Sequence, residues 1–268
     1  MLNKAAIFRR NNVVIAGSGE TTLMLAHGFG CDQNMWNHLI PELSGHYRII
    51  LFDYVGSGKS DLTQYSQARY SSLEGYAQDV IDVCEAVELE NIVFVGHSVS
   101  ATIGLLASIK APQLFSKMVM VCPSPCFLND PPTYHGGFEK EDLEELLNLM
   151  DKNYIGWANY LAPLVVGVSN PAPILSALNE SFCSTDPVVA KTFARATFFS
   201  DYRHKLSSAC HPTLIFQSEN DALASVKVGK YVHENIADSK FEIIEAEGHC
   251  LHMTHPEQVA NSIKAFTK

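Results

Sequence analysis

Short apolar runs alternate along this chain with longer segments of helical periodicity, and this alternation restricts the folds that it can adopt. Between two such runs, residues 73–87 place apolar side chains at steps of three and four, the spacing of an amphipathic helix. The runs that we interpret as buried parallel strands are residues 23–26, 49–52, 92–95, 118–121, 213–217 and 241–244. This alternation of strands and helices predicts an α/β protein with a doubly wound, mostly parallel sheet.

Residues 127–203 have a different pattern. Helical segments at 139–153, 174–182 and 187–199 follow one another there, with no credible strand between them. We therefore expect a helical cap inserted at residues 127–203, with the core formed by residues 1–126 and 204–268. An insertion that follows a strand would lie at the carboxyl ends of the strands, where it would cover a crevice.

The charge of the chain argues against nucleic acid as a partner. Nineteen Lys and Arg against twenty-nine Asp and Glu give a net charge of −10, which would repel a phosphate backbone. No signal-peptide pattern opens the chain, and no uncharged run approaches the about 18 apolar residues that span a membrane. These features predict a cytoplasmic protein with no membrane partner.

The cysteines indicate reduced thiols rather than disulfides or a metal site. They are seven, an odd number, and are scattered through apolar segments. Cys122 and Cys126 have two prolines between them and no second pair of ligands, so a structural zinc is disfavoured. We expect no metal and no cofactor.

The segment Gly58-Lys59-Ser60 looks like the end of a phosphate-binding loop. That motif needs a glycine where this chain has Asp53, and a carboxylate at this position would repel phosphate. A tight turn after the second strand is the better interpretation.

The strongest chemical signal is a serine between a strand and a helix. The run at 92–95 leads directly into Gly96-His97-Ser98-Val99-Ser100 and then into a helical pattern. A serine at so sharp a turn has a strained backbone and an exposed hydroxyl, with a helix N-terminus beside it. The usual motif is G-x-S-x-G, and Ser100 stands in place of its second glycine. We predict that Ser98 is a nucleophile; an ordinary helix cap is the alternative.

A serine nucleophile needs a base and a carboxylate that orients the base. Asp221 and His249 each follow a late strand and come in the order serine, acid, histidine, as in α/β-hydrolases. Glu219 is the alternative acid. His252 and His255 are the alternative bases, and no acidic third ligand accompanies them to suggest a metal site.

The loop His27-Gly28-Phe29-Gly30 directly follows the first strand and matches the position of an oxyanion loop. We predict that the backbone N–H groups of Phe29 and Val99 form the oxyanion hole. The alternative is an ordinary glycine turn.

Taken together, these motifs resemble the α/β-hydrolase superfamily, and within it the RsbQ-like sigma-B regulators and the plant karrikin and strigolactone receptors. The resemblance extends from about residue 13 to residue 266. Besides the loops above, it rests on Leu73-Glu-Gly-Tyr-Ala-Gln-Asp79, Pro123-Ser-Pro-Cys126, Gly136-Gly-Phe138, Asn153-Tyr-Ile-Gly-Trp157, Phe182-Cys-Ser-Thr-Asp186 and Phe198-Phe-Ser-Asp201. It implies a core with a four-helix cap, the triad Ser98, His249 and Asp221, and a closed pocket for a small hydrophobic ligand. The pocket residues that it implies are Phe29, His97, Phe127, Phe138, Trp157, Phe198 and Phe199.

Two kinds of function are consistent with these features. The first is a serine hydrolase that cleaves a small apolar ester or related carbonyl compound through an acyl-enzyme. The second, implied by the resemblance, is a ligand sensor that controls a protein partner, which for RsbQ is a PAS-domain phosphatase. A metabolic carboxylesterase without a partner is a further alternative.

Overall fold

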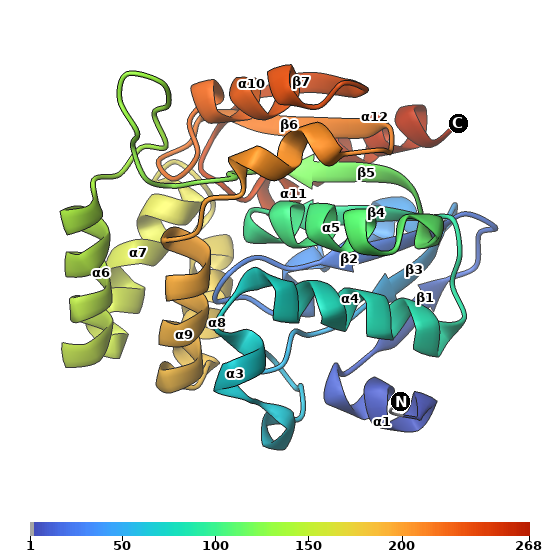
Figure 1. Ribbon diagram of the computed structural model, residues 1–268, viewed down its shortest axis with the longest axis horizontal. Helices are drawn as coiled ribbons and strands as arrows, with labels where there is room; N and C mark the ends of the chain where they lie inside the picture. The colour runs from blue at the N-terminus through green and yellow to red at the C-terminus, as the bar shows by residue number, and fades with distance from the viewer. Residues whose placement is uncertain (1–2) are drawn as a thin grey trace.

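The computed structural model describes residues 3–268, and its centre is a seven-stranded sheet (Figure 1). The strands are β1 (Val14–Gly17), β2 (Thr22–Ala26), β3 (Arg48–Leu51), β4 (Ile92–His97), β5 (Phe115–Val121), β6 (Thr213–Asn220) and β7 (Ser239–Glu247). They are ordered β1-β3-β2-β4-β5-β6-β7, and every neighbouring pair except β1 and β3 is parallel. The predicted α/β class and mostly parallel sheet are confirmed.

The antiparallel strand β1 is absent from the sequence prediction. It has four residues at the edge of the sheet, and most of its side chains are exposed. Such a strand has neither the continuous apolar run of a buried strand nor enough length to show an alternating pattern.

Helices cover both faces of the sheet. They are α1 (Lys4–Arg10), α2 (Ile40–Leu43), α3 (Gln67–Tyr70), α4 (Leu73–Val87), α5 (Val99–Lys110), α10 (Val226–Asn235), α11 (Leu251–Thr254) and α12 (Pro256–Thr267). Helices α4, α5 and α10 pack on one face, and α11 and α12 on the other (Figure 1). Successive side chains of a strand serve the two faces: Leu23 and Leu25 join one core cluster, and Met24 joins the other. No helix within residues 3–268 is both long and apolar enough to cross a membrane.

Four further helices lie between β5 and β6, gathered at one end of the sheet (Figure 1). They are α6 (Lys140–Lys152), α7 (Tyr154–Val166), α8 (Ala172–Ser184) and α9 (Pro187–Phe198). The residue pattern alone identifies three of them. It misses α7, which contains Pro163 and is apolar over most of its circumference, so no amphipathic stripe marks it.

The strand order reverses beside β2. From β2 the chain moves outward to β3, and then crosses back to place β4 on the other side of β2. The loops after β2 and β4 therefore leave from adjacent strand ends, which is the position where open α/β sheets form their binding crevice. The first of these loops begins at His27 and the second contains Ser98.

Candidate active site

Ser98 occupies a strained turn between β4 and α5. Its φ of 55° and ψ of −121° lie outside the regions that L-residues ordinarily adopt, and its N–H donates to the carbonyl of Val121 at 2.8 Å. Gly96 permits this turn, because a Cβ there would lie 2.5 Å from the carbonyl oxygen of Ser100. The sharp connection thus directs the Ser98 side chain away from the sheet at the start of a helix.

His249 joins Ser98 to Asp221 in one hydrogen-bonded chain. Its Nδ1 lies 2.7 Å from Oδ2 of Asp221, and its Nε2 lies 2.7 Å from Oγ of Ser98. A carboxylate only accepts, so Nδ1 carries the proton and Nε2 accepts from the Ser98 hydroxyl. The three residues follow the ends of β4, β6 and β7, and His249 is 151 positions from Ser98 and 28 positions from Asp221 along the chain.

The environment of Asp221 keeps it ionised. Burial alone would raise the pKa of this carboxyl group. The neighbouring His249 and the N–H groups of Ala224 and Leu223, which donate to Oδ1 at 3.0 and 2.8 Å, hold the pKa below its ordinary value. An ionised Asp221 fixes the tautomer of His249 and would stabilise its protonated form.

Two backbone contacts hold the His249 loop. The N–H of His249 donates to the carbonyl of Val165 in α7 at 2.7 Å, and Nε2 of His97 donates to the carbonyl of His249 at 2.9 Å. Burial lowers the pKa of His97 to about 3, so its ring is neutral. The geometry therefore gives His97 a structural contact with the histidine loop in addition to its place beside Ser98.

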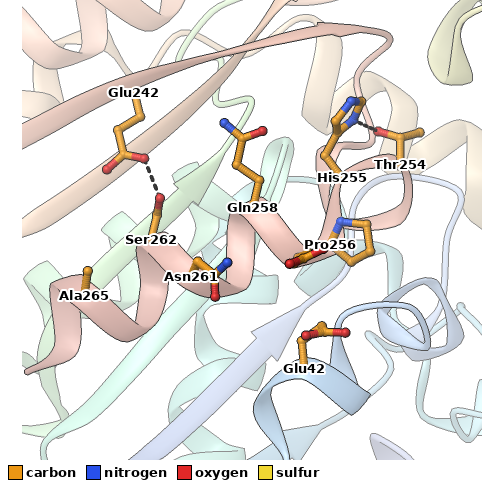
Figure 2. A pocket seen from close by; sticks show the side chains of 10 residues that line it. Glu42, Glu242, Thr254, His255, Pro256, Gln258, Asn261, Ser262 and Ala265 are labelled. Atoms are coloured by element: carbon orange, nitrogen blue, oxygen red, sulfur yellow. Dashed lines mark hydrogen bonds between the residues drawn. The ribbon is translucent and has the colours of Figure 1, made fainter.

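The alternative acid and bases lie apart from this chain of hydrogen bonds. Glu219 is exposed near the end of β6. His252 is fully buried, with its ring centre 4.4 Å from that of Trp36. His255 lines a surface pocket of about 780 Å³ between α2, β7 and α12, where its Nδ1 contacts Oγ1 of Thr254 at 2.9 Å (Figure 2).

The two backbone N–H groups predicted as oxyanion donors have no acceptor in the described part of the chain. Phe29 follows β2 and Val99 begins α5, and neither N–H donates to an acceptor within residues 3–268. Phe29 also lines a chamber together with Ser98. A free N–H at a helix N-terminus, as at Val99, is suited to a developing negative charge, and Phe29 lies on the same chamber.

This chamber is small, and a larger groove adjoins it. Its volume is about 20 Å³, whereas the groove between α6 and α7 measures about 520 Å³. The two share Leu161, Phe198 and Leu223 as a common wall. The chamber as it stands has space for a water molecule but not for an ester.

The predicted pocket residues divide between these spaces and the packing behind them. Phe29, His97 and Phe198 line the chamber, and Phe138 and Phe198 line the groove. Behind them, Trp157 packs on Phe29 and Phe127 on Phe198, with ring centres 5.9 and 5.0 Å apart. Phe199 lines neither space; its ring lies 5.6 Å from the Arg195 guanidinium.

Several wall residues escape the sequence prediction. They are Cys31, Leu161, Val165, Leu178, Phe182, Thr197 and Leu223. Most are apolar residues at helical spacing, and this pattern says that they are buried without saying which space they face.

Cys122 also lies beside the triad. Its thiol and the side chains of Asp221 and His249 have potential ligand atoms within 4.8 Å of one another, the one such group of three within residues 3–268. Nδ1 of His249 and Oδ2 of Asp221 are hydrogen-bonded to each other, which occupies the atoms that a metal would need. Burial, and then the charge of Asp221, raise the pKa of the Cys122 thiol, which disfavours a thiolate ligand.

Asp53 stabilises the turn whose sequence resembles a phosphate-binding loop. Its carboxylate accepts from the N–H groups of Lys59 and Gln33, both at 2.9 Å, and from Nδ2 of Asn12 at 2.7 Å. The turn therefore wraps around a carboxylate rather than around a phosphate.

Residues 21–256 match the family described as the alpha/beta hydrolase fold. The chain belongs to the α/β-hydrolase family. It is 41% identical over 250 residues to the karrikin insensitive 2 receptor CA of Petunia hybrida, covering 93% of this chain and 92% of that protein. It is 35% identical over 254 residues to the strigolactone esterase D14 of Arabidopsis thaliana, covering 94% of each.

A solved structure of a hydrolase from Oleispira antarctica is similar over the whole fold. Its TM-score is 0.97 at 57% identity, and the match covers 99% of this α/β-hydrolase and 97% of that chain. With relatives named as esterases and hydrolases, this α/β-hydrolase is an enzyme of the hydrolase class. The predicted superfamily and its likeness to the karrikin and strigolactone proteins are confirmed.

Proposed function

We propose that this α/β-hydrolase is a serine hydrolase that cleaves small apolar esters or related carbonyl compounds through an acyl-enzyme. The observation that carries the proposal is the unbroken hydrogen-bonded chain from Ser98 through His249 to Asp221, with 2.7 Å at each step. A hydroxyl is a weak nucleophile near neutral pH, and this arrangement supplies the base that it needs.

In the proposed reaction, Oγ of Ser98 attacks the carbonyl carbon while Nε2 of His249 takes its proton. The N–H groups of Phe29 and Val99 hold the oxyanion, and Asp221 stabilises the protonated imidazole. The tetrahedral intermediate collapses to an acyl-enzyme, and His249 gives the proton to the departing alcohol. Water then attacks the acyl-enzyme, with His249 again as base, and releases the acid and Ser98.

We further propose that residues 127–203 act as the cap that controls access. The chamber of about 20 Å³ is too small for a substrate, so the wall of Leu161, Phe198 and Leu223 has to move. Once it moves, the chamber joins the apolar groove between α6 and α7. Phe138 and Phe198 would then face the substrate, and the predominantly apolar lining favours an uncharged ligand.

Hydrolysis of p-nitrophenyl acetate, butyrate and octanoate tests this proposal. The wild type should hydrolyse them with a burst of p-nitrophenol, and Ser98→Ala should show no burst. Leu223→Ala should raise the relative rate on octanoate, because it widens the shared wall while the backbone N–H that contacts Asp221 remains. Equal turnover by wild type and Ser98→Ala would contradict the triad, and unchanged chain-length preference in Leu223→Ala would contradict the access route.

A sensing role is the second candidate, favoured by similarity to proteins named as receptors. In a sensing role, a ligand bound or cleaved beneath the cap changes the cap surface that a protein partner contacts. An RsbQ-like partnership with a PAS-domain phosphatase in the cytoplasm would be one form of it. Binding of a purified PAS-domain phosphatase should then change when Ser98 is blocked; binding that is absent, or indifferent to the block, would leave the enzyme role alone.

A further inference from the structure

Ser100 is the part of the elbow motif that the proposed reaction does not use. It stands in place of the motif's second glycine, and it is fully buried in the first turn of α5. Its Oγ donates a short hydrogen bond to the carbonyl of His27 and lies 2.9 Å from the hydroxyl of Tyr54. The side chain therefore bridges the nucleophile helix to the residue that begins the oxyanion loop.

The hydrogen-bond directions in this cluster follow from simple valence. A carbonyl oxygen only accepts, so the Ser100 proton points to His27 and the Tyr54 hydroxyl must donate to Ser100. The N–H of Tyr54 donates to Nε2 of His27 at 3.1 Å, which leaves the proton of the neutral ring on Nδ1. Burial lowers the pKa of His27, in keeping with a neutral ring.

Nδ1–H of His27 in turn orients the next peptide unit. It donates to the carbonyl of Gly28 at 2.9 Å. The peptide between Gly28 and Phe29 is planar and trans, so the N–H of Phe29 points away from the side on which His27 holds the carbonyl. The loop passes close to His97 at this point, because a Cβ on Gly28 would lie 2.5 Å from Nδ1 of His97.

We propose that Ser100, together with Tyr54, is a positioning residue that fixes the Phe29 N–H in the oxyanion hole by holding His27. This inference rests on the proposed serine-hydrolase function. A glycine or alanine at position 100 would leave the buried His27 carbonyl and Tyr54 hydroxyl without their shared partner, and the loop would lose its tie to α5.

The test compares Ser100→Ala with Ser108→Ala. Ser108 is a matched control, because it is a buried serine of the same helix that bonds the carbonyl of Leu105 within that helix at 2.9 Å. For Ser100→Ala we expect kcat on p-nitrophenyl butyrate to fall about tenfold, less than the 10²–10³ of a deleted oxyanion donor, with KM within about twofold. Affinity for a trifluoromethyl ketone, which forms a tetrahedral adduct at Ser98, should fall by the same factor. Ser108→Ala should match the wild type in both.

A merely structural role would not make kcat and the affinity for the tetrahedral adduct fall together. A folded Ser100→Ala with kcat and ketone affinity within twofold of wild type would overturn the positioning role. If Ser100→Ala does not fold, Tyr54→Phe decides: a parallel fall in both supports the role, and no change overturns it. Phosphonate labelling separates the two proposals, since a wild type that is not labelled at Ser98 defeats the proposed function itself.

Discussion

At the scale of single residues, the surroundings of Asp221 and Glu219 differ, and the proposed triad uses only the first of these two acids. Asp221 is buried and bonded to His249, whereas Glu219 is exposed at the same strand end. We expect Asp221→Asn to lower kcat by about 10⁴, because the tautomer of His249 would no longer be fixed, and Glu219→Gln to leave kcat unchanged. Steady-state hydrolysis of p-nitrophenyl butyrate measures both, and the reverse result would assign the acid to Glu219.

The buried histidines predict loss of stability in acid. Burial lowers the pKa of His97 to about 3 and the pKa of His252 well below 6.5. The unfolded chain therefore binds protons below pH 6.5 that the folded chain does not, and stability falls as the pH drops from 6.5 toward 3. At pH 5 the expected loss from His97 is about 2 kcal/mol, and His252 adds a loss in the same direction.

His252→Phe isolates one of these contributions. The His252 ring forms no hydrogen bond within residues 3–268, so phenylalanine removes the titrating group without stranding a partner. Urea unfolding at pH 7.5 and pH 5 should show a smaller loss for this variant than for the wild type, while the exposed control His46→Gln should show the wild-type loss. An equal loss in His252→Phe and wild type would contradict the assignment.

The sequence alone brings Ser98, Asp221 and His249 forward as candidates. Ser98 stands out because strand, sharp turn and helix are consecutive, and Asp221 and His249 stand out because each follows a strand whose carboxyl end lies at the same edge of the sheet. The position of Cys122 beside these residues could not be predicted, since only the packing of separate strands brings its thiol to the Asp221 carboxylate. The contact of Ser100 with Tyr54 could not be predicted for the same reason, because the two residues are 46 positions apart.

At the scale of elements, one carboxylate on α4 ties two other helices to it. Asp79 is fully buried, and its Oδ1 lies 3.3 Å from Arg10 of α1 and 2.6 Å from Arg69 of α3. Its two oxygens also accept from Tyr70 at 3.0 and 3.1 Å. Removing the carboxylate would leave the buried Arg10 with a partner lost.

We expect Asp79→Ala to lower the free energy of unfolding by about 3–5 kcal/mol. The control is Glu144→Gln, which breaks the exposed pair of Lys140 and Glu144 on α6, 3.6 Å apart, and should cost at most about 0.5 kcal/mol. Urea titration followed by circular dichroism measures both. Similar small losses in the two variants would show that the Asp79 cluster does not join these helices.

Helices and strands, like single residues, could be predicted where the signal lies in neighbouring residues of the sequence. Buried strands appear in the sequence as short continuous apolar runs, and amphipathic helices as apolar residues at steps of three and four. Strands β2 to β7 and helices such as α4 were therefore predictable. Strand β1 is exposed at an edge of the sheet, and α7 is apolar on nearly all sides. Both are stabilised by contacts with distant parts of the chain, which a local sequence pattern does not reveal.

At the scale of the whole molecule, helices α6 to α9 and the sheet share one continuous core. The same cluster contains Trp36 from the segment after β2, Trp157 of α7 and Val95 of β4. A shared core favours a single cooperative transition, although the four helices form a separate stretch of chain.

The two tryptophans of the chain make this testable. Trp36→Phe leaves Trp157 as the reporter of α7, and Trp157→Phe leaves Trp36 as the reporter of the core that packs on the sheet. In each variant we expect the urea midpoint from tryptophan fluorescence to coincide with the midpoint from circular dichroism. A fluorescence transition of Trp157 that precedes the loss of circular dichroism would show that α7 unfolds independently of the sheet.

The proposed reaction depends on the hydrogen-bonded chain from Asp221 through His249 to Ser98, and labelling with a fluorophosphonate tests whether this chain activates the serine. The reagent reacts with a serine only when a base activates the hydroxyl. We predict one adduct per chain, mapped by mass spectrometry to the peptide that contains Ser98, and labelling at least about 100-fold slower in His249→Ala. A wild type that remains unlabelled, or whose adduct maps to another residue, would contradict the role of Ser98 as nucleophile.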